Sequence, residues 1–273
     1  MKNDVTFGQY YPVNSFVHNM DSRVKLLLLI AYIVMIFIVK NFFGFIVAGG
    51  FLLVAILFAR VPIFSVLRSI KAVLFIIILT FLINIFLHKE DGAVVIFNWW
   101  IFTITDLSLN FSVFMALRLI FLVLGSSILT LTTTPIALTD GIESLLTPLK
   151  YIKFPVHELA LIMSIALRFI PTLMEETNRI ISAQKARGAE FDSGNLFKRA
   201  KALIPVLIPL LFSSFRRADE LGDAMDARCY SASKNRTKYK KLKLSYRDFV
   251  ATLFIVAMFA GVILLNTYGV NIV

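Results

Sequence analysis

Five stretches of the chain are almost free of charged residues, and their length restricts the fold more than any other feature. They comprise residues 26–39, 42–59, 72–87, 107–131 and 249–265. A helix of about 20 residues crosses a hydrocarbon core ~30 Å thick, so these stretches, the shorter ones extended by polar flanks, are expected to span a membrane. The chain is 58% hydrophobic with 26 Phe and only 16% charged residues, which is too apolar for a soluble domain of 273 residues. The sequence therefore predicts an all-α membrane protein with about five transmembrane helices.

Basic residues at the ends of these stretches are distributed unequally. Those before the first stretch and between the second and third are Lys2, Arg23, Lys25, Arg60, Arg68 and Lys71, whereas the opposite loops contain Lys40 and Lys89. By the positive-inside rule the N-terminus is predicted to be cytoplasmic, and after four crossings the segment from 132 to 247 is cytoplasmic as well. We therefore expect a multi-pass cell-membrane protein of three parts: a membrane region at 1–131, a cytoplasmic domain at 132–247 and a last transmembrane helix at 248–273.

The predicted cytoplasmic domain contains most of the 28 Lys and Arg residues of a chain whose net charge is +11. Membrane topology and attraction to anionic lipid headgroups account for such a surplus. A nucleic-acid partner is not expected, because the basic residues are not interleaved with aromatic ones and no binding motif accompanies them. The partner that the composition predicts is the lipid bilayer.

Three amphipathic helices are predicted inside this domain, before the last transmembrane helix. A short one, capped by Thr139 or Asp140, precedes two long ones at 156–189 and about 195–230. The first half of the 156–189 helix is apolar enough to resemble a spanning segment. Arg168 in its middle and its polar continuation favour a helix that lies along the membrane face.

Both long helices end on an arginine between small residues. The two tips are Ala186, Arg187 and Gly188 in the first helix, and Ala227, Arg228 and Cys229 in the second. Small neighbours leave the guanidinium unshielded, and its rigid fork of donors suits paired hydrogen bonds to a carboxylate in a groove of another protein. The alternative is favourable placement of a cation at a helix C-terminus, with Gly188 as the residue that ends the helix. Two tips in matched positions favour docking.

Three carboxylates precede the second tip at steps of four and three residues. Asp219, Asp223 and Asp226 are therefore expected on one face of the helix. They form either an acidic docking face for a basic partner surface or an ordinary solvated face. The neighbouring Arg216 and Glu220 are expected to form a surface pair that contributes little stability.

Four stretches resemble one known family. They are GQYYPVNSFVHNMDSRVKLLLL at 8–29, LTLTTTPIALTDGIESLLTPLK at 129–150, HELALIMSIALRFIPTLMEETNRIISAQKARGAEF at 157–191 and DAMDARCY at 223–230. In these the chain resembles the transmembrane T component of energy-coupling-factor (ECF) transporters, closest to the type shared among vitamin transporters. The stretches occur in the family's order, and the combination of two Ala-Arg signatures with an amphipathic helix pair is specific.

This resemblance implies a scaffold that joins two cytoplasmic ABC-type ATPase subunits to a small membrane-embedded S component, for uptake of vitamins or other micronutrients. Arg187 and Arg228 match the arginines that end the family's crossed coupling helices and dock on the ATPases. Cys229 stands where Ala or Gly is usual. We expect the S component to contact apolar residues of both helices, namely Ile162, Met163, Ala166, Ile170, Leu173, Leu207, Leu210 and Leu211.

The sequence offers no catalytic or cofactor site of its own. It lacks a P-loop ending in Gly-Lys-Ser/Thr, so ATP and Mg are expected on the partner ATPases. A membrane-embedded enzyme is one alternative, but its best motif is the single pair His157-Glu158, and a glutamate at a helix start explains that pair as well. An autonomous carrier is the other, and it predicts inverted repeats, which we do not find.

Arg118 stands within an otherwise apolar stretch, where a charge is costly and often functional. We favour a structural role, in which it pairs with Asp106 or with helix backbone carbonyls, over a place in a transport path.

Overall fold

The structure is a computed structural model that describes residues 10–87, 95–99, 102–189, 191, 195–230 and 243–268. Its described part divides into two compact units, one formed by residues 155–230 and the other by the residues before 155 together with those from 243 onward. Residues 8 and 9, which begin the first family-like stretch, lie outside the described residues. The boundary between the compact units falls after Phe154. The predicted cytoplasmic domain at 132–247 describes a position relative to the membrane, and it stays a prediction.

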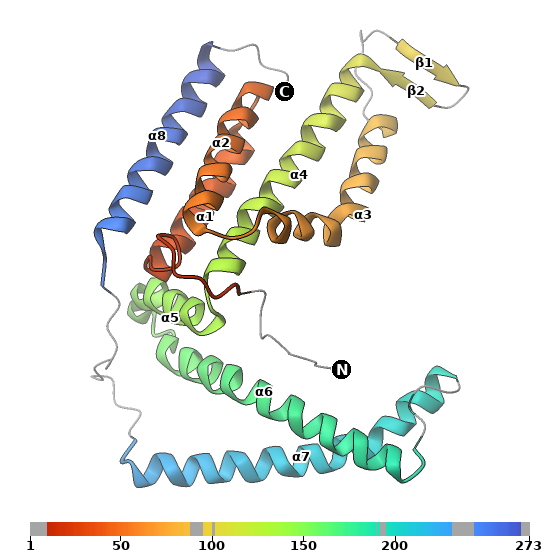
Figure 1. Cartoon of the computed structure of the whole chain (residues 1–273), viewed down its shortest axis with the longest axis vertical. Coiled ribbons are helices and arrows are strands. Elements are labelled where there is room, and N and C mark those ends of the chain that lie inside the picture. The colour runs from red at the N-terminus through yellow and green to blue at the C-terminus, as the bar shows by residue number, and fades with distance from the viewer. Residues whose placement is uncertain are drawn as a thin grey trace. The chain divides into compact units, whose positions relative to one another are not determined.

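The larger unit is helical (Figure 1). Its elements are α1 (Ser22–Ile38), α2 (Phe42–Ala59), α3 (Ile63–Leu87), β1 (Val95–Trp99), β2 (Phe102–Thr105), α4 (Asp106–Thr132), α5 (Pro135–Leu146), the 3-10 helix η1 (Thr147–Ile152) and α8 (Tyr246–Tyr268). The predicted all-α class is confirmed. The sequence interpretation missed one detail, the small antiparallel hairpin in which β1 pairs with β2 between α3 and α4.

Side-chain caps explain where several helices begin. Asp21 accepts a hydrogen bond from the Arg23 N–H, and Asn41 accepts one from the Gly44 N–H. The cap predicted for α5 at Thr139 or Asp140 is wrong: Thr134 caps the helix, and Pro135 follows as its first residue. Proline suits that position because its φ is already helical and the missing N–H would have no partner there. The predicted start was too late because the first turn, Pro135 to Leu138, has no periodic pattern long enough to recognise.

The core of the larger unit lies between α1, α2, α4 and α8. Its fully buried side chains are Met35, Ile36, Val39, Ala48, Phe114 and Val262. Outward faces of the same helices expose large apolar side chains, among them Phe43 at 66% and Leu57 at 69%. Water would penalise so much exposed apolar surface, whereas hydrocarbon does not, so these faces suit a lipid environment.

Five described helices are long and apolar enough to cross a membrane, judged by length and composition alone: α2, α3, α4, α6 and α8. The predicted five included α1 and not α6, and the other four are the same. Helix α1 has 17 residues and is shorter than the others, and α6 qualifies through its apolar first half. The prediction that α6 lies along the membrane face stays a prediction.

The smaller unit consists of two long helices, α6 (Val156–Ala186) and α7 (Leu196–Ala227), which cross one another (Figure 1). Their observed ends lie within a few residues of the predicted ones. Pro171 lies inside α6, and Pro205 and Pro209 lie inside α7. The carboxylate of Glu176 on α6 accepts a hydrogen bond from Arg217 on α7 at 3.4 Å, which links the two helices by an ion pair.

Candidate functional site: two matched helix tips

Helices α6 and α7 end in the same backbone motif. At the end of α6, the Gly188 N–H donates to the Lys185 carbonyl at 3.0 Å and the Ala189 N–H donates to the Gln184 carbonyl at 3.0 Å. At the end of α7, Cys229 donates to Asp226 and Tyr230 donates to Met225, both at 2.9 Å. Each tip is thus a Schellman motif, in which two N–H groups beyond the helix satisfy carbonyls of its last turn. The similarity of the two tips in sequence is also a similarity in structure.

Each motif places one residue in the left-handed region. Gly188 has φ +87° and Cys229 has φ +55°. Glycine adopts this conformation without steric cost, whereas a residue with a Cβ is disfavoured by about 1–2 kcal/mol. The departure of Cys229 from the usual small residue therefore falls on the one position of the tip at which glycine is the least strained residue.

Each signature arginine stands between the last residue of its helix and the left-handed residue of the turn. Arg187 and Arg228 are both exposed, as are Ala186 and Ala227 beside them. Within the described part of the chain, neither guanidinium has a carboxylate partner within 4.0 Å. Two charged forks with small neighbours are free to pair with groups on another molecule.

The carboxylates near the second tip are exposed as well. Asp219, Asp223 and Asp226 all lie on the surface of the last turns of α7. Nearby, Arg216 pairs with Glu220 at 3.9 Å, and their side chains are 77% and 69% exposed. This pair has the surface character expected for it, because solvent weakens the attraction between such exposed charges.

The apolar positions predicted to contact a membrane partner are largely accessible. Ile162 and Met163 on α6 are 60% and 51% exposed, and Leu207 and Leu211 on α7 are 58% and 57% exposed. Ala166 is exposed too, whereas Ile170, Leu173 and Leu210 are half-buried. The structure adds Phe215, 62% exposed, which the sequence interpretation missed although it continues the four-residue step from Leu207 and Leu211.

Arg118 belongs to the larger unit, whereas both tips belong to the smaller one. Its Nη2 donates to the Val39 carbonyl at 3.1 Å, and its guanidinium lies over the Phe114 ring at 5.0 Å. Of the two kinds of partner that the sequence left open, Asp106 and a backbone carbonyl, the structure shows the carbonyl. This side chain links α4 to the end of α1, which supports the structural role.

Together the fold and the tips define a class: an α-helical membrane protein that carries a pair of crossed amphipathic helices, each ending on an exposed arginine. The family model described as cobalt transport protein, CbiQ, matches residues 13–239. Three similar relatives bear the name energy-coupling factor transporter transmembrane protein EcfT. The protein from Ruminiclostridium cellulolyticum is 48% identical over 97% of this chain and 98% of its own length.

The other two are the proteins from Clostridium kluyveri, 50% identical over 93% of both chains, and from Bacillus subtilis, 43% identical over 91% of this chain and 93% of its own length. The chain belongs to this family of ECF transporter transmembrane proteins. The resemblance noted in the sequence is confirmed. The chain is therefore a transport protein of the membrane.

Proposed function

We propose that this chain is the subunit that transmits ATP-driven movement to the substrate-binding component of an ECF importer. In this proposal Arg187 and Arg228 each dock in a groove on one of two cytoplasmic ABC-type ATPases. ATP and Mg bind to those ATPases and not to this chain. The observation that carries the proposal is the pair of matched tips, since both arginines are exposed within a Schellman motif and neither has a carboxylate partner among the described residues.

Closure of two ATPases would draw the two tips together. Long helices are stiff, and the Glu176–Arg217 pair links α6 to α7, so a displacement at the tips moves the rest of both helices. The apolar residues of α6 and α7 that were predicted to contact the S component would hold it, and the S component would bind the vitamin or other micronutrient. Asp219, Asp223 and Asp226 would help to position basic ATPase surface beside the second tip.

The proposal also includes the orientation: the N-terminus and both tips face the cytoplasm. It rests on the basic residues that flank α1, α2 and α3. Labelling of Cys229 tests it directly, because this exposed thiol is the single cysteine of the chain. A membrane-impermeant maleimide should label it in inverted vesicles and leave it unlabelled in intact cells.

Charge reversal tests docking. We expect Arg187→Glu and Arg228→Glu, singly and together, to abolish co-purification of the ATPases and substrate uptake. Arg179→Glu on α6 and Arg216→Glu on α7 are matched controls, because each reverses an exposed arginine of the same helix away from the tip. Intact association and uptake in the Arg187→Glu, Arg228→Glu double variant would show that docking does not use the tips.

Contact with the S component is tested separately. Leu207→Glu and Met163→Glu place a charge on the exposed apolar face, so they should lose the small membrane protein while the ATPases still co-purify. If the purified chain transported substrate by itself, the alternative of an autonomous carrier would be right. Turnover of a substrate by the chain alone would favour the membrane-embedded enzyme.

A further inference from the structure

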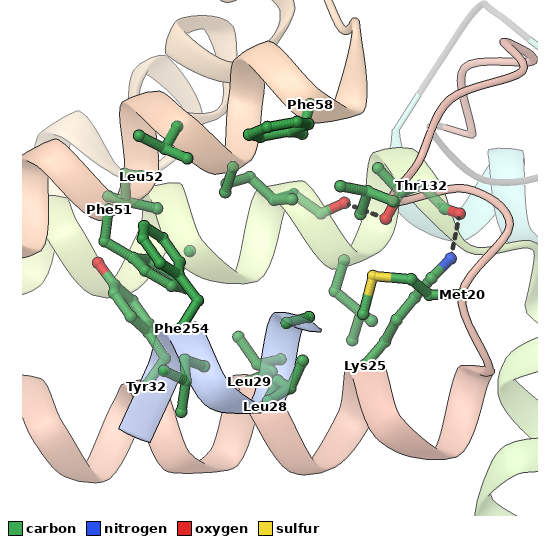
Figure 2. Close-up of a pocket in the computed structure, with 18 of the residues that line it drawn as sticks. Met20, Lys25, Leu28, Leu29, Tyr32, Phe51, Leu52, Phe58, Thr132 and Phe254 are labelled. Atoms are coloured by element: carbon green, nitrogen blue, oxygen red, sulfur yellow. Dashed lines mark hydrogen bonds between the residues drawn. The ribbon is translucent and has the colours of Figure 1, made fainter. Parts of the chain in front are cut away.

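An apolar cavity lies inside the larger unit, between α1, α2, α4 and α8. Its volume is about 570 Å³, which is within the range of ~300–1,000 Å³ typical of ligand pockets. Figure 2 shows Tyr32, Phe51, Leu52 and Phe254 around it. None of the residues that line this cavity is among those proposed for docking of the helix tips or for contact with the S component.

One side of this cavity reaches the surface. On the α8 wall, Leu253 is 60% exposed and Phe254 is 43% exposed, although both line the cavity. The outward faces of these helices suit hydrocarbon, as argued above, so the opening connects an apolar cavity with the lipid phase. A hydrocarbon chain can enter there without desolvating any polar group.

Lys25 lies at one end of the cavity, but its ammonium is already occupied. Its Nζ donates to the carbonyls of His18 and Thr132 at 3.1 and 3.0 Å and to the Thr133 hydroxyl at 3.4 Å. Figure 2 shows the bond to Thr132. An ammonium has three donors, so Lys25 has none left for a ligand. The polar end of a ligand must therefore bind elsewhere.

A second cavity of about 650 Å³, more polar than the first, adjoins it, and the two share Phe16 and Phe58 as lining residues. The rings of Phe16 and Phe58 lie 5.8 Å apart, and Phe16 also meets Tyr246 at 6.4 Å. The second cavity is lined by Asn14, Asn19, Arg60 and Arg247. It lies where α2 ends and α8 begins, which is the predicted cytoplasmic face of the membrane.

Both arginines of the polar cavity are available to an anion. Within the described residues no carboxylate forms an ion pair with Arg60 or Arg247. The nearby Asp248 accepts from the N–H groups of Asp21 and Ser245 at 2.9 and 2.7 Å, so its charge is already hydrogen-bonded. Two cations beside an apolar cavity that opens toward lipid match a phospholipid with an anionic headgroup.

We propose that this pair of cavities binds one anionic phospholipid, with an acyl chain between α1, α2, α4 and α8 and its phosphate at Arg60 and Arg247. The aromatic wall of Phe16, Phe58 and Tyr246 lies at the junction between the headgroup and the chain. The bound lipid fills a cavity that would otherwise be empty, so it is expected to stabilise the packing of α8 on α1 and α2.

Retention of defined lipids by the full chain tests this proposal. The protein is delipidated in mild detergent and titrated with dioleoylphosphatidylglycerol or dioleoylphosphatidylcholine, and the bound lipids are counted by native mass spectrometry. We expect one saturable lipid for each chain, with a preference for the anionic lipid on the order of tenfold. The double variant Arg60→Gln, Arg247→Gln should bind both lipids equally.

Filling the apolar cavity tests the acyl chain. Ala55→Phe on α2 and Ala251→Phe on α8 each replace a small lining residue with a ring, so retention of both lipids should be lost. Arg68→Gln and Ala72→Phe are matched controls, because both alter exposed positions of α3 away from the cavities and should bind lipid as the wild type does. An unchanged melting temperature in at least one filled variant separates loss of lipid from misfolding.

Three results would overturn the proposal. The first is lipid binding that never saturates and is alike in all variants, as for ordinary boundary lipid. The second is a preference for phosphatidylglycerol that survives the loss of both arginines. The third is a filled variant that keeps its lipid but no longer co-purifies with a membrane protein partner, since the cavity would then receive a protein.

Discussion

The carboxylate of Glu176 and the guanidinium of Arg217 meet at 3.4 Å where α6 crosses α7. Their side chains are 26% and 30% exposed, so this pair is partly shielded from solvent. The two residues are 41 positions apart in the sequence. Contacts of this kind make two separate helices respond together, which the proposed transmission of movement requires.

Neutralising this pair should loosen the crossing. In a cycle of Glu176→Gln, Arg217→Gln and the double variant, we expect a coupling free energy of about 0.5–1 kcal/mol, because a partly shielded pair lies at the upper end for surface ion pairs. Hydrogen exchange of the α6 and α7 amides in the four proteins of the cycle measures this coupling free energy. The Arg216 and Glu220 pair, at 3.9 Å and more exposed, is the control and should give a smaller coupling. Equal couplings would show that the crossing gains nothing from its ion pair.

The left-handed residue at the second tip should respond to glycine. We expect Cys229→Gly to stabilise the end of α7 by about 1 kcal/mol, since the φ of +55° is strained for any residue with a Cβ. Gly188→Ala is the reverse change at the first tip, where a Cβ meets nothing within 4 Å, so its cost should come from backbone strain alone. Exchange rates of the Tyr230 and Ala189 amides report the two tips. Faster exchange at Tyr230 in Cys229→Gly would contradict this explanation.

Gly125 permits α4 to approach α1. A Cβ added there would clash with Cε1 of the Tyr32 ring. That ring cannot easily move, because it is buried, stacks on Phe51 at 5.8 Å and donates from its hydroxyl to the Phe121 carbonyl. We expect Gly125→Ala to lower the stability by about 1–3 kcal/mol.

The matched control for this change is Gly50→Ala, whose Cβ would meet nothing within 4 Å. Replacing a helical glycine by alanine without a clash should stabilise α2 by up to about 1 kcal/mol. The melting temperatures of the two variants in detergent should therefore move in opposite directions. A similar decrease in both would show that close approach to Tyr32 is not the cause.

Asp21 should give the fold a dependence on pH. Its side chain is 1% exposed, and burial alone would raise its pKa, but the hydrogen bonds and charge of Arg23 lower the pKa below its ordinary value. A carboxyl with a lower pKa in the folded state stabilises that state above the unfolded pKa of about 4, and this contribution is lost as the pH falls.

We therefore expect the wild type to melt above Asp21→Asn at pH 5 to 7, and the difference to shrink below about pH 4. Asparagine is also a good N-cap, so the comparison isolates the charge. Arg23→Gln should reduce the same pH dependence, because it removes the group that lowers the pKa. A difference that grows toward low pH would have the wrong sign and would contradict this assignment.

Several elements were predictable because they depend on local sequence. The charge-free stretch at 42–59 has the bounds of α2, and the stretch at 107–131 is one residue shorter at each end than α4. The stretch at 72–87 missed the first turns of α3, because Arg68 and Lys71 interrupt the apolar run. Both residues are exposed at the start of the helix, where charge is tolerated.

The sequence by itself determined the apolar lengths, the helical periods and the two Ala-Arg tips, since each is a property of neighbouring residues. Only the tertiary structure decided which distant side chains meet. Arg118 donates to the Val39 carbonyl and not to Asp106, and Glu176 forms an ion pair with Arg217. The two cavities that share Phe16 and Phe58 combine residues from both ends of the chain. Such contacts depend on the register and crossing of helices, which side-chain packing decides and no single helix encodes.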